Sequence, residues 1–125
     1  MLRAASFAVT AVAAVLLAAP AAAQDIAAGE KAFNKCKACH TLEKGGAHRV
    51  GPNLHGMFGR AAGAVEGFKF SDAMKNSGVV WTPETVDQYI TRPREFIKGN
   101  RMAFAGINNA EERANLIAYL QQATK

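Results

Sequence analysis

Cysteine is scarce in this chain, with only Cys36 and Cys39 among 125 residues. A disulfide and a thioredoxin-like redox pair are the ordinary interpretations of two cysteines so close together. A redox pair of that type should lie near a βαβ pattern, and no segment here is strand-rich. A zinc site would need further ligands at suitable spacing. His48 and His55 are present, but a second C-x-x-C is not.

Long apolar runs and phosphate-binding motifs are also missing. The apolar run over residues 7–17 is too short to span a bilayer, and the glycines form no G-x-x-x-x-G-K-S/T pattern. The formal net charge is +5, but no stacking or groove-reading motif accompanies it, so nucleic acid is not an expected partner. No acid–base or nucleophile–base pair is evident, and after residue 24 there is no repeat or second domain.

The two cysteines are followed directly by a histidine. Residues 36–40 read Cys-Lys-Ala-Cys-His, the C-x-x-C-H pattern of covalent haem attachment. Two thiols that add to the two vinyl groups of one porphyrin must lie about one helical turn apart. Positions i and i+3 satisfy this, and i+4 lies on the same face. His40 is therefore expected beside the ring, with an imidazole nitrogen free to bind iron.

Residues 1–23 have the pattern of a secretory signal peptide. A basic start precedes the apolar run, Pro20 interrupts it, and residues 21–23 (Ala-Ala-Ala) supply a small-residue cleavage site. An uncleaved membrane anchor is the competing interpretation. We expect cleavage before Gln24, which leaves residues 24–125 as one small domain in a bacterial periplasm, with no transmembrane segment. A domain of this size buries a modest core, and covalent haem would complete it.

The sequence after the signal predicts an all-α fold of three to five helices and long loops wrapped around one covalent haem. Each expected helix begins at a capping residue. The expected helices cover residues 25–37, 71–77, 82–92 and the segment after Asn109, with Asp25, Ser71, Thr82 and Asn109 as caps and Glu112 as the capping partner of Asn109. Residues 43–68, which are rich in glycine, and residues 94–108 are expected to be irregular.

The second axial position of the haem iron decides between functions. An open position suits binding or activation of small molecules, whereas a filled one favours electron transfer. Spacing alone does not choose among the candidate ligands, which are Met57, Met74, Met102, His48 and His55. Context favours Met102, because it follows the non-helical stretch 99–101 and precedes Phe104, which could cover the haem edge.

Several further motifs occur in a fixed order along residues 24–125. They are residues 36–46 (CKACHTLEKGG), 51–60 (GPNLHGMFGR), 67–68 (GF), Trp81, Tyr89, 102–107 (MAFAGI) and 116–120 (LIAYL). Together they resemble the class I cytochromes c, of the bacterial type close to the mitochondrial protein. Several motifs in the right order are far more specific than C-x-x-C-H alone.

This resemblance implies one haem c, attached through Cys36 and Cys39, with His40 and Met102 as the axial ligands. The other groups that it places around the haem are Pro52, Arg60, Trp81, Tyr89 and Asn100. In that pattern the Pro52 carbonyl accepts the second N–H of His40 and fixes its ring. Tyr89 reaches the Met102 sulfur, and Arg60 and Trp81 face a buried propionate. Gly29 and Phe33 pack against Leu116 and Tyr119 where the first and last helices cross.

Three positions depart from the mitochondrial pattern. Phe70 replaces a tyrosine, which removes one propionate hydrogen bond. Met74 replaces a polar residue near the haem. Asn100 replaces a threonine that bonds a propionate, a role that an amide can also fill. These departures bear on the reduction potential and on stability at high pH, not on the ligand set.

The resemblance implies a soluble, monomeric periplasmic electron carrier, not an enzyme, that shuttles single electrons from a cytochrome bc complex to a terminal oxidase or a photosynthetic reaction centre. Basic side chains that flank the attachment and Met102 segments are expected to ring the haem edge and dock on acidic surfaces. They are Lys35, Arg49, Arg94, Lys98 and Arg101. The alternatives are a haem enzyme or gas-binding sensor with a displaceable sixth ligand, and an electron-transfer subunit of a periplasmic dehydrogenase.

Overall fold

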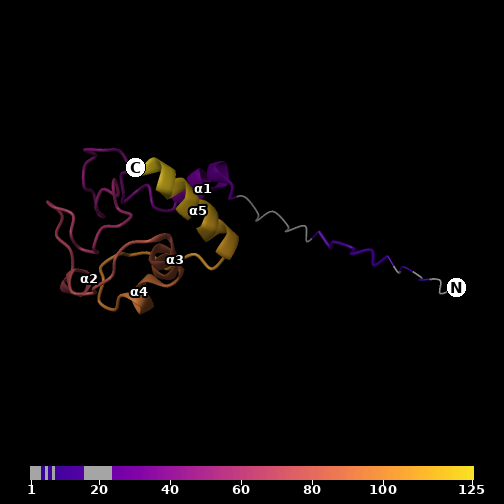
Figure 1. The fold of residues 1–125 in the computed structure, drawn as a ribbon. Helices are drawn as coiled ribbons and strands as arrows, with labels where there is room; N and C mark the ends of the chain where they lie inside the picture. Colours follow the sequence, from indigo (N-terminus) through magenta and orange to yellow (C-terminus); the bar gives the residue numbers. More distant parts are fainter. Residues whose placement is uncertain (1–3, 5, 7, 16–23) are drawn as a thin grey trace.

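The computed structural model describes residues 4, 6, 8–15 and 24–125. It contains the helices α1 (Ile26–Phe33), α2 (Asp72–Lys75), α3 (Pro83–Thr91), α4 (Pro93–Phe96) and α5 (Ala110–Ala123), shown in Figure 1. Within the described ranges there is no β-strand, only one isolated antiparallel bridge between Ala61 and Val80. The predicted all-α fold is therefore confirmed. The predicted cleavage site at residues 21–23 lies outside the described residues and stays a prediction.

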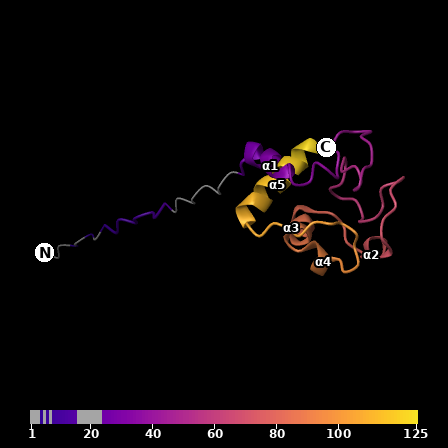
Figure 2. The same cartoon turned by 180° about the vertical axis from the view of Figure 1, so that it is seen from behind.

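The domain's first and last helices, α1 and α5, cross in direct backbone contact (Figures 1 and 2). A Cβ atom on Gly29 would lie only 2.0 Å from the Asn115 carbonyl oxygen, so the missing side chain permits the approach. The rings of Phe33 and Tyr119 pack at a centroid distance of 6.0 Å. The helix crossing predicted from the resemblance is thus present, and it fixes the end of α1 from which the cysteine segment leaves.

The helices begin largely where capping residues predicted them. Asp25 accepts a hydrogen bond from the Ala28 N–H at 3.0 Å, and Ser71 accepts one from Met74 at 3.1 Å. Thr82 caps α3 with Pro83 as the first helical residue. These side chains satisfy backbone donors that a helix start leaves without partners.

Only one of the two hydrogen bonds of the predicted Asn109–Glu112 capping pair forms at the start of α5. Asn109 accepts from the Glu112 N–H at 2.9 Å, as expected. The Glu112 carboxylate, however, forms an ion pair with Lys35 instead of returning to the Asn109 backbone. Glu112 therefore links α5 to the segment that carries the cysteines.

The helices differ from the prediction in three places, and one of them is the helix expected over residues 71–77, which covers only Asp72–Lys75. The first helix ends at Phe33, not near Lys37, and residues 34–39 continue as hydrogen-bonded turns. Residues 93–96 form the single-turn helix α4, which extends into the segment 94–108 that was expected to be irregular and is closed by an Ile97 N–H to Pro93 carbonyl bond of 3.2 Å. A four-residue helix is too short to show a hydrophobic period, so the pattern could not reveal it.

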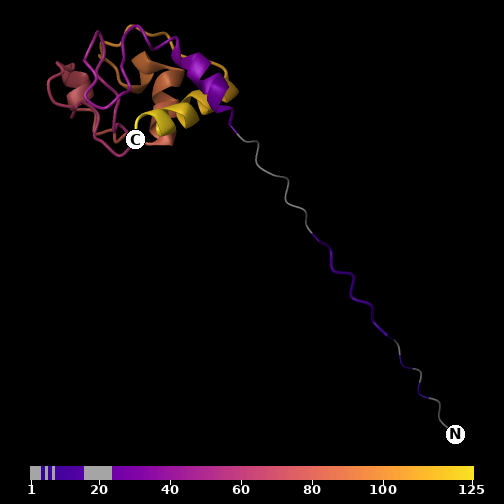
Figure 3. The same ribbon diagram turned by 90° about the horizontal axis from the view of Figure 1, so that it is seen from above.

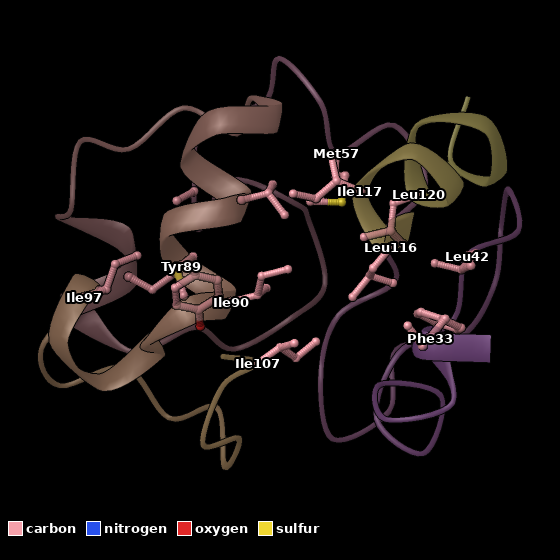
Figure 4. Packing of buried hydrophobic residues seen from close by; sticks show 14 residues of the cluster. Phe33, Leu42, Met57, Tyr89, Ile90, Ile97, Ile107, Leu116, Ile117 and Leu120 are labelled. Carbon is pink, nitrogen blue, oxygen red and sulfur yellow. The ribbon is translucent and has the colours of Figure 1, made fainter. Parts of the chain in front are cut away.

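Seen from above, the long loops and α2 lie at one end of the domain, with α1, α3 and α5 at the other (Figure 3). The buried apolar side chains come from segments spread over residues 32–120. In Figure 4, Tyr89 and Ile97 lie on one side of the view, and Phe33, Leu42 and Leu116 on the other. None of the described helices is long and apolar enough to cross a membrane.

Candidate functional site

A cavity of about 300 Å³ lies between the cysteine segment, the loop over residues 50–71, and the Met102 segment. Most of its lining is apolar. The predicted site residues that line it are Cys36, Cys39, His40, Pro52, Arg60, Trp81, Tyr89 and Met102. The structure thus brings together all of the predicted site residues except Asn100, which does not line the cavity but bonds to Tyr89 and Met102, which do.

His40 is held in one orientation. Its Nδ1 atom lies 2.7 Å from the Pro52 carbonyl oxygen, and because a carbonyl only accepts, Nδ1 carries the hydrogen. This leaves Nε2 as the nitrogen available to a metal. Burial lowers the pKa of His40, and the hydrogen bond to Pro52 acts in the opposite direction. The neutral imidazole that metals require is therefore the favoured form.

The two cysteines lie in the turns that follow α1. The Cys36 N–H bonds to the Phe33 carbonyl at 2.8 Å and the His40 N–H bonds to the Cys36 carbonyl at 3.0 Å. Both thiols are free and half-buried, so they do not form the alternative disulfide. Burial raises the pKa of the Cys36 thiol to about 11, with Lys35 opposing the change.

Arg60 and Trp81 reach the cavity side by side because their backbones pair. Trp81 donates its N–H to the Arg60 carbonyl at 2.9 Å, and its own carbonyl accepts from Gly59 at 2.7 Å. The Arg60 guanidinium donates to the His55 carbonyl at 2.7 Å. A cationic side chain and an indole therefore share one wall of the cavity, as binding of a buried carboxylate would require.

The candidate second ligands separate into two groups. His48 and His55 do not line the cavity, whereas Met57, Met74 and Met102 do. His48 is instead used structurally, because its Nε2 atom bonds to the Glu66 carbonyl at 2.9 Å and its Nδ1 atom accepts the Asn53 N–H at 2.9 Å.

Among the three methionines, Met102 has a polar partner at its sulfur. The Tyr89 hydroxyl lies 3.7 Å from Met102 Sδ, and burial raises the pKa of Tyr89 to about 12. The hydroxyl therefore keeps its proton and can donate it. Met57 and Met74 are 9% and 8% exposed and belong to the apolar core.

Asn53 is a structural residue of the site that the sequence did not single out. Its buried amide donates to Thr41 Oγ1 at 2.8 Å and to the Glu43 carbonyl at 2.9 Å. These bonds hold the loop after His40 against the loop that carries Pro52. The signal was present, since Asn53 lies within the GPNLHGMFGR motif, but the motif does not indicate where the amide hydrogens go.

Two of the three departures from the mitochondrial pattern enlarge the apolar lining. Phe70 packs edge-on against Phe68 at a centroid distance of 4.9 Å, and both rings line the cavity together with Met74. Phe70 and Met74 thus present no hydrogen-bond donor of the kind that a tyrosine or another polar side chain would offer.

The five basic side chains expected to surround the haem edge are all exposed. Lys35 and Arg101 lie at the cavity, whereas Arg94 lies on α4. Lys35 is the member that has an ion-pair partner, Glu112, so part of its charge is compensated.

Comparisons with known proteins identify the family of this chain. The family model described as "Cytochrome c" matches residues 26–124. Cytochrome c of Chlamydomonas reinhardtii is 51% identical over 107 residues, 85% of this chain and 96% of the relative. Cytochrome c2 of Blastochloris viridis is 49% identical over 104 residues, covering 83% and 82% of the two chains, and cytochrome c of Ginkgo biloba is 46% identical over 101 residues, covering 80% and 89%.

The cavity fits the prosthetic group of that family on the observations above. Two free thiols, an oriented imidazole and a mostly apolar lining meet in one place, and a haem needs these attachment points and this environment. The chain therefore belongs to the cytochrome c family of electron-transfer haem proteins and carries one haem c bound covalently through Cys36 and Cys39.

Proposed function

We propose that this protein is a periplasmic carrier of single electrons in which His40 and Met102 are the axial ligands of the haem. The observation that carries the proposal is the position of Met102. Its side chain lines the same cavity as Cys36, Cys39 and His40, and its sulfur is the one that the Tyr89 hydroxyl approaches.

The residues of this site suit a carrier more than a catalyst. The bound haem supplies a one-electron iron couple. His40 and Met102 would fill both axial positions, and a thioether opposite an imidazole favours the reduced form. Apolar side chains around the cavity exclude water and disfavour the more highly charged oxidised state. The cavity wall offers Arg60 as a fixed cation but no acid–base pair poised for proton transfer.

Location and partners belong to the same proposal. The signal-like N-terminal sequence favours export to the periplasm. Five exposed basic side chains favour docking on acidic surfaces of membrane redox complexes, with a cytochrome bc complex as donor and a terminal oxidase or reaction centre as acceptor.

The ligand assignment is tested by replacing Met102 with alanine in the holoprotein. The ferric spectrum should lose its near-infrared iron–sulfur band, the reduction potential should fall, and the ferrous form should bind carbon monoxide readily. Met57→Ala and Met74→Ala are the matched controls, because both methionines line the same cavity.

Loss of the band in either control variant, with the band kept in Met102→Ala, would contradict the assignment. Carbon monoxide binding to the unsubstituted protein tests the alternative function, a gas-binding sensor or haem enzyme. Ready binding of carbon monoxide by its ferrous form would indicate a displaceable sixth ligand, and thus a sensor or enzyme instead of a carrier.

A further inference from the structure

Asn100 has an unusual number of partners for a loop side chain. It follows Gly99, whose φ of +89° reverses the chain after α4, and it precedes Met102 by two positions. Its backbone N–H bonds to the Ile97 carbonyl at 3.1 Å. The side chain therefore folds back over the loop instead of extending into the cavity.

The nitrogen of the Asn100 amide donates both of its hydrogens, one to α4 and one to the residue that follows α4. Nδ2 donates one hydrogen to the Pro93 carbonyl and the other to the Ile97 carbonyl, each at 2.8 Å. Pro93 is among the most deeply buried side chains of the domain. The amide is thus anchored to a rigid part of the fold, and no amide hydrogen remains for a haem propionate.

The oxygen of the Asn100 amide accepts hydrogen bonds from two residues that line the cavity, Met102 and Tyr89. Oδ1 accepts the backbone N–H of Met102 at 2.9 Å and the hydroxyl of Tyr89 at 3.2 Å. The same hydroxyl lies 3.7 Å from the Met102 sulfur. A phenol has one hydrogen, so the amide oxygen and the thioether compete for it.

We propose that Asn100 is a positioning residue for Met102: its amide clamps the Met102 segment to α4 and takes a share of the Tyr89 hydrogen bond away from the sulfur. This inference rests on the proposed role of Met102 as an axial ligand. The sulfur is then held at the iron by the loop, and its lone pair is less engaged by Tyr89. Asn100 differs in this respect from a threonine, whose single hydroxyl hydrogen cannot serve two carbonyls.

The test is the affinity of the ferric holoprotein for imidazole, which must displace the iron–sulfur bond in order to bind. In Asn100→Ala the loop loses its clamp, so imidazole should bind about tenfold more tightly, the effect expected from one ordinary hydrogen bond. Asn108→Ala is the matched control, because the Asn108 side chain is exposed and makes no hydrogen bond within the described chain. Its imidazole affinity should not change.

Two further variants keep the test decisive if Asn100→Ala fails to fold. Asn100→Thr should bind imidazole with an affinity between those of the unsubstituted protein and Asn100→Ala, since it keeps one donor and one acceptor. In a Tyr89→Phe background, replacing Asn100 should have a smaller effect, because the shared hydroxyl is gone. An undiminished effect there would overturn the competition between amide and sulfur.

The outcome separates this inference from the proposed function. If Met102→Ala abolishes the iron–sulfur band while Asn100→Ala binds imidazole as Asn108→Ala does, Asn100 is not a positioning residue and the ligand assignment stands. If Met102→Ala keeps the band, the ligand assignment itself fails, and the role of Asn100 fails with it.

Discussion

At the scale of the residue, only glycine fits at position 51, because the ring of His40 occupies the space that a side chain would need. A Cβ atom there would lie 2.4 Å from His40 Cε1 and 2.8 Å from both ring nitrogens. The glycine is adjacent to Pro52, whose carbonyl orients the same ring. Two neighbouring residues thus set the position of His40, one by its carbonyl and one by the absence of a side chain.

Gly51→Ala should therefore displace the imidazole or the loop. We expect a loss of about 1–3 kcal/mol in unfolding free energy, the usual range for overpacking, together with a changed reduction potential. Gly78→Ala is the control. Its Cβ would meet nothing within 4 Å and only its φ of +70° causes strain, so stability should fall while the potential stays constant. A potential unchanged in both variants would mean that Gly51 does not position His40.

The sequence was enough to name most of the side chains that meet at this cavity. It was not enough to name all of their hydrogen-bond partners. His40 and Pro52 could be paired because the resemblance supplied the partner. The sequence suggested a propionate as the partner of Asn100, whereas its amide hydrogens go to the carbonyls of Pro93 and Ile97. Those carbonyls belong to a helix of one turn that no periodicity revealed, so the partners could not be inferred before the fold was known.

At the scale of the element, the crossing of α1 and α5 depends on Gly29. Its absent Cβ would lie 2.0 Å from the Asn115 carbonyl oxygen and 2.8 Å from Tyr119 Cβ. Asn115 also accepts the Asp25 N–H at 2.9 Å, which joins the start of α1 to α5. The helices can approach this closely only because α1 carries no side chain at the contact.

Gly29→Ala should push the two helices apart despite alanine's better helix propensity. We expect the holoprotein to lose about 1–3 kcal/mol of stability, which outweighs the roughly 1 kcal/mol that the substitution offers in an unconstrained helix. Chemical denaturation followed by circular dichroism measures it. Ala27→Ser, at an exposed position of the same helix, should change stability by less than about 0.5 kcal/mol. A stabilised Gly29→Ala protein would show that the helices can separate without cost.

Helix starts were easier to predict than helix ends. Caps such as Asp25 and Thr82 bond to backbone three positions away, so the signal is local. The end of α1 at Phe33 has no such marker, because residues 34–39 keep hydrogen-bonded turns that place Cys36, Cys39 and His40 at the cavity. Glu112 has the residue type of a capping partner, but Lys35, distant in sequence, binds it instead.

At the scale of the whole molecule, the basic side chains proposed for docking differ in whether their charge is compensated. Arg49 and Arg101 are exposed, and neither has an ion-pair partner among residues 24–125, unlike Lys35 with Glu112 and Lys75 with Asp72. Arg101 lies at the cavity itself, next to Met102. Uncompensated charges near the haem should dominate the attraction to an acidic partner, whereas Lys35→Glu would also place a like charge against Glu112 and disturb α5.

The docking proposal is therefore best tested with Arg49→Glu combined with Arg101→Glu. The second-order rate of electron transfer with a purified cytochrome bc complex should fall about tenfold at low salt, because steering by complementary charge is lost. The rate of the unsubstituted protein should decrease steeply as salt rises, since exposed charges are screened over about 8 Å at physiological ionic strength, and this dependence should flatten in the variant. Lys44→Glu combined with Lys125→Glu changes the net charge equally, at two exposed side chains without an ion-pair partner among residues 24–125, and should have a much smaller effect. Equal losses in the two double variants would mean that only net charge matters and that no docking face surrounds the cavity.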